Sequence, residues 1–99
     1  MSDTRAWDMK VFLRVASRGS FSAAGRDVGM TPSSTAKLVS RLEERLGVRL
    51  IERSTRRLRL TAEGEVYRER AEALLGELDA LDAEAAGGAR SPTGPLRIS

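Results

Sequence analysis

The strongest constraint on the fold of this 99-residue chain is a set of three glycines that divide its first half into short helical segments. Gly19, Gly29 and Gly47 each follow a run with helical periodicity, and glycine is the residue that most often ends a helix. They predict helices over residues 4–17, 21–28 and 32–46. A chain of this length is expected to form one small domain with a modest core.

Apolar residues recur every three or four positions in each segment, which predicts one buried face per helix. Ser20 and Thr31 stand where N-cap hydroxyls are expected, and Pro32 suits the first position of the third helix. The side chains expected to be buried are Trp7, Val11, Phe12 and Val15 in the first helix, Phe21, Ala24 and Val28 in the second, and Thr35, Val39, Leu42 and Leu46 in the third.

The opposite face of the third helix is predicted to be small, hydroxyl-bearing and cationic. At about 100° per residue, Ser33, Lys37 and Glu44 point away from the buried face. Arg41 flanks them, and Glu43, like Glu44, is expected to face solvent.

Two short runs with β-strand character follow the third helix, at residues 49–53 and 57–60. In the second run Leu58 and Leu60 alternate with arginines, which is the period of a half-buried strand. The two runs predict a β-hairpin that carries Arg56 at its tip.

The last predicted helix, residues 62–86, is long for so small a domain. It is expected to begin after the N-cap residue Thr61 and to span about 37 Å. Its apolar residues are spaced by four and three in alternation, the heptad pattern of a coiled-coil contact. The helix could instead pack against its own domain. The pattern favours a partner helix, because only the early part of this helix can reach the rest of so small a domain. The candidate dimer-interface residues are Tyr67, Ala71, Leu74, Leu78 and Leu81.

The sequence divides into three parts. Residues 1–61 hold the three short helices and the hairpin, residues 62–86 the long helix, and residues 87–99 a Gly- and Pro-rich hinge followed by the start of a strand. A domain does not usually end on the opening of a strand, so we expect a further domain to follow. No apolar run has the length of a membrane span or a signal core, and a cytoplasmic location is expected.

Charge is distributed unevenly between these parts. Residues 1–61 hold 13 Lys and Arg against 6 Asp and Glu, a net charge of +7, whereas residues 62–99 hold 4 against 8, a net charge of −4. A basic half of this kind favours a polyanionic partner such as nucleic acid. The absence of Cys and His excludes hydrolases built on Ser-His or Cys-His pairs and thiolate metal sites. We expect no enzyme, no cofactor and no metal site.

Three short helices followed by a basic hairpin predict a mainly α fold, a winged helix-turn-helix with a two-stranded β-hairpin wing and a long linker helix. In such a fold the third helix enters the major groove, and small side chains at its N-terminal end leave room for the base edges. Serines at the start of the second helix suit a phosphate, and an arginine at the wing tip suits a minor groove. The candidate DNA-binding residues are Ser20, Ser22, Thr31, Pro32, Ser33, Ser34, Ala36, Lys37, Arg41, Arg53 and Arg56.

Several of these residues also have a plainer explanation. Ser33 and Ser34 are common in the first turn of any helix, and Lys37 could be an ordinary solvated lysine. Arg53 could brace the hairpin or pair with Glu52 instead of contacting DNA.

The chain resembles the DNA-binding N-terminus of the LysR-type transcriptional regulators. The matching stretches are residues 19–24 (GSFSAA), 39–53 (VSRLEERLGVRLIER) and 56–65 (RRLRLTAEGE). The resemblance implies a linker helix that forms a homodimer, usually antiparallel, and a C-terminal effector-binding domain of periplasmic-binding-protein type. It implies binding to an interrupted pseudo-palindromic site in double-stranded DNA, commonly as a homotetramer of the full-length protein. Transcription would be activated or repressed in response to a small-molecule effector held by the C-terminal domain.

The resemblance also implies that residues 31–37 begin the recognition helix and that Arg56 is the wing arginine. The sequence departs from the family pattern where bases are read. Pro32 stands where many members have Gln, and Ala36, Lys37 and Leu38 replace a common Ser, Arg and Gln. These changes favour apolar contact with thymine methyl groups, or readout of DNA shape.

A second hypothesis comes from a different functional class. It is a protein-interaction module that acts through the heptad helix and a basic hairpin. The two hypotheses differ in which half of the chain matters, because residues 62–86 alone would retain the activity of an interaction module.

Overall fold

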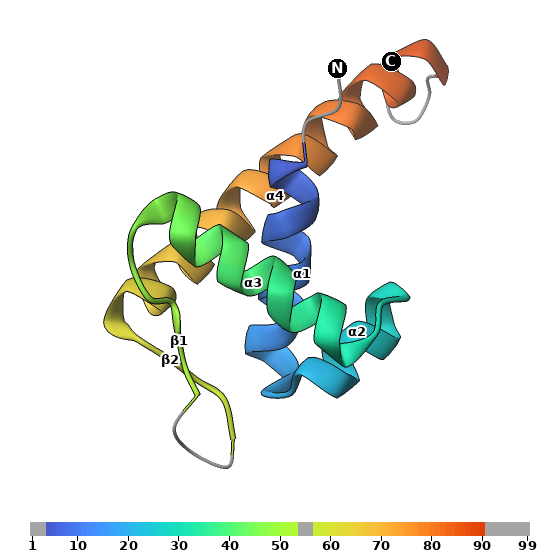
Figure 1. Cartoon of the computed structure of the whole chain (residues 1–99). Helices are drawn as coiled ribbons and strands as arrows, with labels where there is room; N and C mark the ends of the chain where they lie inside the picture. The colour runs from blue at the N-terminus through green and yellow to red at the C-terminus, as the bar shows by residue number, and fades with distance from the viewer. Residues whose placement is uncertain (1–3, 54–56, 91–99) are drawn as a thin grey trace.

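The computed structural model describes residues 4–53 and 57–90, with the side chains of residues 88–90 excepted. Its elements follow in the order α1 (Arg5–Arg18), α2 (Phe21–Val28), α3 (Pro32–Leu46), β1 (Ile51–Glu52), β2 (Arg59–Leu60) and α4 (Ala62–Arg90). In Figure 1, α3 crosses the front of the molecule, the strands β1 and β2 lie below it, and α4 projects beyond the other elements. This is the predicted mainly α winged helix-turn-helix with a long last helix.

The helix starts follow from the hydroxyls that the sequence places before them. Each of three N-cap oxygens accepts a backbone N–H three residues later: Ser20 Oγ from Ala23 at 3.2 Å, Thr31 Oγ1 from Ser34 at 3.0 Å, and Thr61 Oγ1 from Gly64 at 2.9 Å. The first three helices end at the predicted glycines. These local signals confirm the predicted boundaries of α2 and α3, whereas α1 begins and ends one residue later than expected.

The turn between α2 and α3 depends on a glycine inside α2. A Cβ atom at Gly25 would lie 2.5 Å from the Met30 carbonyl oxygen and 2.9 Å from Thr35 Oγ1. The Gly25 carbonyl oxygen accepts the N–H of Met30 at 2.7 Å, which closes the turn. Gly25 costs helix propensity, but it lets α3 approach α2 closely. The position of α3 therefore depends on this contact.

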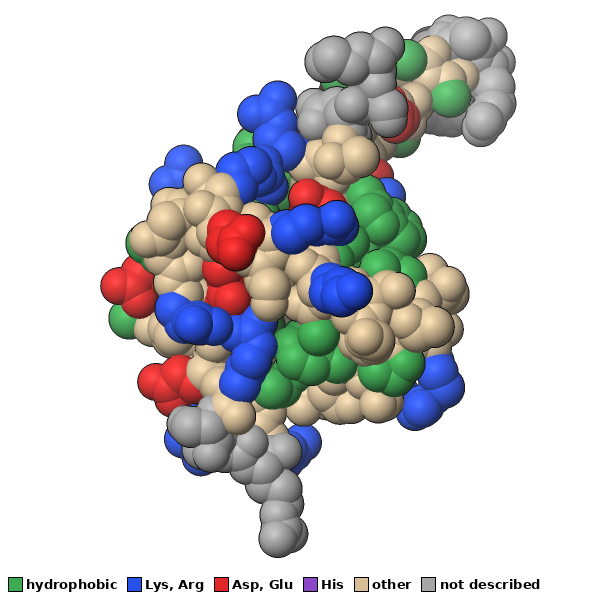
Figure 2. All heavy atoms as spheres, viewed as in Figure 1, with side chains coloured by type: hydrophobic (Ala, Val, Ile, Leu, Met, Phe, Trp, Pro, Cys, Tyr) green, Lys and Arg blue, Asp and Glu red, His purple; other side chains and the backbone are tan. Residues whose placement is uncertain are grey.

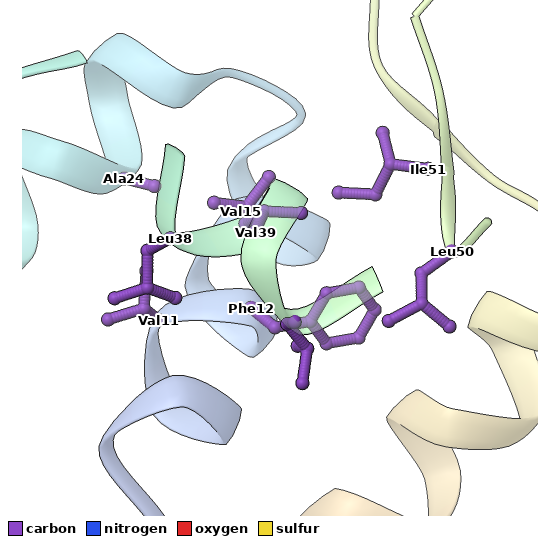
Figure 3. Close-up of a cluster of buried hydrophobic side chains, with 9 residues drawn as sticks. Val11, Phe12, Val15, Ala24, Leu38, Val39, Leu50 and Ile51 are labelled. Carbon is purple, nitrogen blue, oxygen red and sulfur yellow. The ribbon is translucent and has the colours of Figure 1, made fainter. Parts of the chain in front are cut away.

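The core lies where α1, α2, α3 and β1 meet. Figure 3 shows Val11 and Val15 of α1 beside Leu38 and Val39 of α3, and the Phe12 ring between α1 and Leu50, with Leu50 and Ile51 on the side next to the wing. Phe12 also meets Tyr67 of α4 edge-on, with ring centroids 5.3 Å apart. Burial raises the pKa of the Tyr67 hydroxyl, so the ring stays neutral in this contact.

The wing strands are shorter than predicted. Each spans two residues, with Ile51 paired to Leu60 and Glu52 to Arg59 in an antiparallel ladder. The backbone before β1 is bonded elsewhere, because the Leu50 N–H donates to a Glu43 carboxylate oxygen and the Arg49 carbonyl oxygen accepts the Thr61 hydroxyl. These bonds tie residues 49 and 50 to Glu43 of α3 and to Thr61, the residue between β2 and α4.

The N-terminal part of α4 packs against its own domain, and two of the predicted interface positions, Tyr67 and Ala71, lie in this part. Ala71 is buried, and Tyr67 contacts Phe12, because α4 packs against α1 and β2 in this part of its length. The other predicted positions, Leu74, Leu78 and Leu81, are between 45% and 61% exposed. The helix also continues through Gly87 to Arg90, four residues past the predicted end.

Two other residues predicted to be buried are more than a third exposed. Trp7 lies in the first turns of α1, where it shares a shallow hollow with Leu75 of α4. Leu46, at the end of α3, lines an open apolar groove with Val48 and Val66. Both lie at the end of a helix, where the core covers only one side of the side chain.

No helix in the described part of the chain has the length and apolarity needed to cross a membrane. Among the same residues, no group of three or more acidic side chains is placed to hold a metal ion.

Candidate nucleic-acid interface

The outer face of α3 begins at its capped N-terminus. Thr35 turns inward, where its hydroxyl donates to the Thr31 carbonyl oxygen at 2.8 Å, and the rest of the buried face is apolar. Leu38 belongs to this buried face, so it is a core residue and not a position that reads bases. The side chains left outside are small or polar: Pro32, Ser33, Ser34, Lys37, Ser40 and Arg41 are exposed and Ala36 is half-buried.

Lys37 and Arg41 supply the positive charge of this face. They lie four residues apart, about one helical turn, and both side chains are exposed. Neither makes an ion pair with another residue of the described part of the chain. A cation with no internal partner is available to a phosphate oxygen or to the acceptor edge of a guanine.

The start of α2 adds two hydroxyls next to α3, since α2 and α3 pack closely. Ser22 is exposed, whereas Ser20 is half-buried and its oxygen already accepts the Ala23 N–H. A hydroxyl that accepts one bond keeps its hydrogen as a donor. Ser20 and Ser22 are therefore both able to donate to an anion at this helix end.

Arg53 has a different place from the one predicted for a DNA contact. Its side chain is 27% exposed, its Nη2 lies 3.1 Å from Glu43 Oε1, and its guanidinium lies over the Phe21 ring at 5.6 Å from the centroid. The guanidinium is therefore held inside the protein, between α2, α3 and the wing. The expected brace is present, but with Glu43 as its acidic partner.

Glu43 is the residue that sequence reasoning missed. It was expected in solvent, but only 6% of its side chain is exposed. Its Oε2 accepts the N–H groups of Leu50 and Ile51 at 2.8 and 3.0 Å. A helical projection places Glu43 about 40° from the buried Val39, at the edge of the apolar face, and this signal could have revealed it.

Positive charge elsewhere on the molecule is partly neutralised. Arg14 and Arg18 at the end of α1 both face Asp27 of α2, at 3.6 and 3.5 Å, and Arg45 faces Asp8 at 3.6 Å. Figure 2 shows the face that carries α3, with Lys and Arg side chains spread among acidic, apolar and uncharged ones. The predicted wing-tip residue Arg56 lies outside the described residues.

Three comparisons place these features among known proteins. Residues 7–65 match the bacterial regulatory helix-turn-helix proteins of the lysR family. The HTH-type transcriptional regulator CrgA of Neisseria meningitidis serogroup C (strain 8013) is 41% identical over 95 residues, which cover 96% of this chain and 32% of that regulator. The HTH-type transcriptional activator AaeR of Escherichia coli (strain K12) is 39% identical over 90 residues, covering 91% and 29%. The chain thus spans less than a third of the length of these relatives.

Solved structures agree in fold. BenM DBD in its complex with catB site 1 DNA matches with a TM-score of 0.84 at 25% identity, covering 90% of this chain and 99% of that one. CbnR DBD in its DNA complex matches with a TM-score of 0.80 at 30% identity, covering 87% and 99%.

Proposed function

Because this chain belongs to the lysR family of bacterial regulatory helix-turn-helix proteins, we propose that it binds double-stranded DNA sequence-specifically and so regulates transcription. The observation that carries the proposal is the outer face of α3. Small side chains at its N-terminal end allow a close approach to bases, and Lys37 and Arg41 lie exposed just behind them. The solved DNA complexes of BenM DBD and CbnR DBD support it, because they share this fold.

The contacts that we propose are of three kinds. The N-cap of α3 and residues of α3 face the bases: Thr31, Pro32, Ser33, Ser34, Ala36, Lys37 and Arg41. Ser20 and Ser22 donate to a phosphate beside α2, and Arg56 enters a minor groove. Arg53 acts indirectly, by holding the wing against α2 and α3.

We propose that the DNA-binding unit is a homodimer formed through α4. Support comes from Leu74, Leu78 and Leu81, which follow the heptad spacing and are exposed. Leu78 and Leu81 lie beyond Leu75, the last residue of α4 that is buried against the domain among the described residues. A dimer reads two half-sites, so the operator is an interrupted pseudo-palindrome.

For the longer protein, we propose a C-terminal effector-binding domain after residues 87–99. The length of the curated relatives supports this, because the chain covers less than a third of them. In that protein the unit is a homotetramer in the cytoplasm, and a small-molecule effector controls it.

Selection of bound duplexes from a random DNA pool tests the proposal. Recovery of an interrupted palindrome is the expected result. Recovery of a single half-site would contradict the dimer and leave base reading in place. If no duplex is enriched and a peptide of residues 62–86 binds protein partners as well as the whole chain does, the protein-interaction module is the better explanation.

Replacing Lys37 by Ala tests the outer face of α3 directly. We expect a loss of about 1–3 kcal/mol in binding, or about five- to a hundredfold in Kd, because one contact to a base or phosphate is removed. If that contact is to phosphate, the slope of log K against log salt falls by about one. Fluorescence anisotropy at several salt concentrations measures both quantities.

The matched control is Lys10→Ala. Lys10 is the only other lysine of the chain and lies exposed on α1 beside Trp7 and Leu75. The two variants change the net charge equally, so equal losses of affinity would mean that the whole charge of the domain, and not the face of α3, binds DNA.

A further inference from the structure

Residues 49–51 lie between two helices and are bonded to both. On one side they meet the C-terminal half of α3, and on the other the start of α4. Of residues 49–51, only Ile51 belongs to the wing ladder, because β1 begins at that residue. It is therefore the point where the recognition helix and the linker helix are joined.

The bonds to α3 all go to Glu43. Its Oε2 accepts the N–H groups of Leu50 and Ile51 at 2.8 and 3.0 Å, and its Oε1 faces Arg53 Nη2 at 3.1 Å and Arg49 Nη1 at 3.5 Å. Hydrogen bonds to an ionised acceptor are stronger than neutral ones, and this carboxylate is buried. Glu43 thus fixes residues 49–51 against α3.

The bonds to α4 all involve Thr61. Its N–H donates to the Leu50 carbonyl oxygen at 2.9 Å, and its hydroxyl donates to the Arg49 carbonyl oxygen at 2.6 Å. The same hydroxyl oxygen accepts the N–H of Gly64 and so caps α4. A Cβ atom at Gly64 would clash with the Leu50 carbonyl oxygen, so the first turn of α4 rests directly on this segment.

We infer that Glu43 and Thr61 are positioning residues that fix the angle between α3 and α4, and that this angle sets the distance between the two half-sites that the dimer reads. The inference rests on the proposed dimeric DNA binding. In such a dimer the two recognition helices are related through the paired α4 helices, and each α4 is held to its own domain by residues 49–51 and by its packing on α1 and β2. One base pair of extra spacing moves a half-site by about 3.4 Å and rotates it about the DNA axis, so a rigid junction accepts one spacing.

The test is a series of duplexes that carry two copies of the selected half-site. The spacers between them cover about one helical turn, or about ten base pairs. Kd is measured for the wild type, Glu43→Gln and Thr61→Val on every spacer and on an isolated half-site. Both replacements are close in size to the original residue. Glu43→Gln removes the charge that faces Arg49 and Arg53 on the α3 side, while its amide oxygen can still accept the Leu50 and Ile51 N–H groups. Thr61→Val removes the hydroxyl that bonds the Arg49 carbonyl oxygen and caps α4.

The wild type is expected to prefer one spacer by about tenfold or more over its neighbours, which corresponds to about one additional well-placed contact. Each variant is expected to bind the neighbouring spacers within about threefold of the best one. The isolated half-site should be bound by all three proteins within about twofold, because neither residue lies on the outer face of α3. Unchanged half-site binding also shows that a variant is folded.

Two matched controls show whether the effect depends on the buried carboxylate of Glu43 and on the hydroxyl of Thr61. Glu44→Gln removes the same charge from the exposed neighbour of Glu43, and Thr61→Ser keeps the hydroxyl. Both are expected to keep the sharp preference of the wild type.

The outcomes distinguish this inference from the function on which it rests. If the wild type binds paired half-sites no more tightly than an isolated half-site, both the proposed dimer and the inference are wrong. If the wild type prefers one spacer and the variants keep the same preference, the inference is wrong and the proposed dimer stands. A variant that loses half-site affinity as much as paired-site affinity likewise shows a structural role and no role in spacing.

Discussion

At the scale of single residues, the least expected feature is a carboxylate inside a DNA-binding domain. Glu43 replaces the water it loses with two backbone N–H groups and two guanidinium groups. Its Oε1 and Arg53 Nη2 are both buried and face each other without hydrogen-bond geometry, so their contact is ionic. Removing one partner of such a pair costs more than the pair contributes, because the other charge stays buried.

This asymmetry gives a prediction for stability. Arg53→Met is expected to lower the free energy of unfolding by about 2–3 kcal/mol, below the usual value for a fully buried pair because Arg53 is partly exposed and Arg49 remains. Glu43→Met is expected to cost more, since it also leaves the N–H groups of Leu50 and Ile51 unpaired. Urea denaturation followed by circular dichroism measures both.

The double variant Glu43→Met with Arg53→Met completes a double-mutant cycle with the two single variants. It is expected to be more stable than Glu43→Met alone, because no buried charge is left without a partner. Arg59→Met, at an exposed position of β2, is the control and should change stability by no more than about 0.5 kcal/mol. Additive losses in the double variant would mean that the two side chains do not interact energetically.

At the scale of helices and strands, features set by neighbouring residues could be predicted and features set by distant ones could not. The N-caps Ser20, Thr31 and Thr61 bond within three residues, so their pattern alone locates the helix starts. The wing was predicted too long because the partners of residues 49 and 50 lie in α3 and α4. Ala71 fits a heptad by spacing, but its burial depends on α1, which periodicity within one helix does not report.

The candidate site shows the same division. The small polar face of α3 was predictable, since helical geometry alone decides which side chains point outward. The burial of Glu43 and its pairing with Arg53 were not, because they depend on a contact between a residue of α3 and one ten positions later, after β1.

A prediction for α4 follows from its exposed leucines. Leu78→Glu is expected to weaken the dimer at least tenfold, because it places a charge in an apolar helix contact. Sedimentation equilibrium measures the dimer constant. Ala83→Glu is the control, since it adds the same charge about 140° around the exposed part of the helix. Equal effects of the two variants would mean that the leucine face is not the interface.

At the scale of the whole molecule, the chain is elongated, with extents of 53 × 29 × 26 Å. Only the first part of α4 is covered by the domain, and residues 76–87 are all exposed. The second half of α4 thus lies apart from the basic winged helix-turn-helix, whereas its first half packs on it.

This separation predicts the result of truncation. A chain that ends at Gly76 keeps the buried Ala71 and Leu75 and loses the exposed Leu78 and Leu81. We expect its free energy of unfolding to lie within about 1 kcal/mol of that of the whole chain, since the removed part of α4 contributes no buried side chain among the described residues. It should be a monomer that binds a single half-site with the affinity of the intact chain. Loss of half-site binding in a folded, truncated chain would show that α4 itself contacts DNA.

The continuity of α4 has one more consequence. From the turn that rests on Leu50 to the exposed Leu81 there is no break in the helix. The number of residues between these two points therefore sets the direction in which the leucine face points. One inserted residue turns the leucine face by about 100° and advances it by about 1.5 Å, whereas seven return it to within about 20° of its direction. Over evolutionary time, insertions and deletions in this segment are therefore acceptable in whole heptads, and single ones must be matched by a change in the operator or in the partner face.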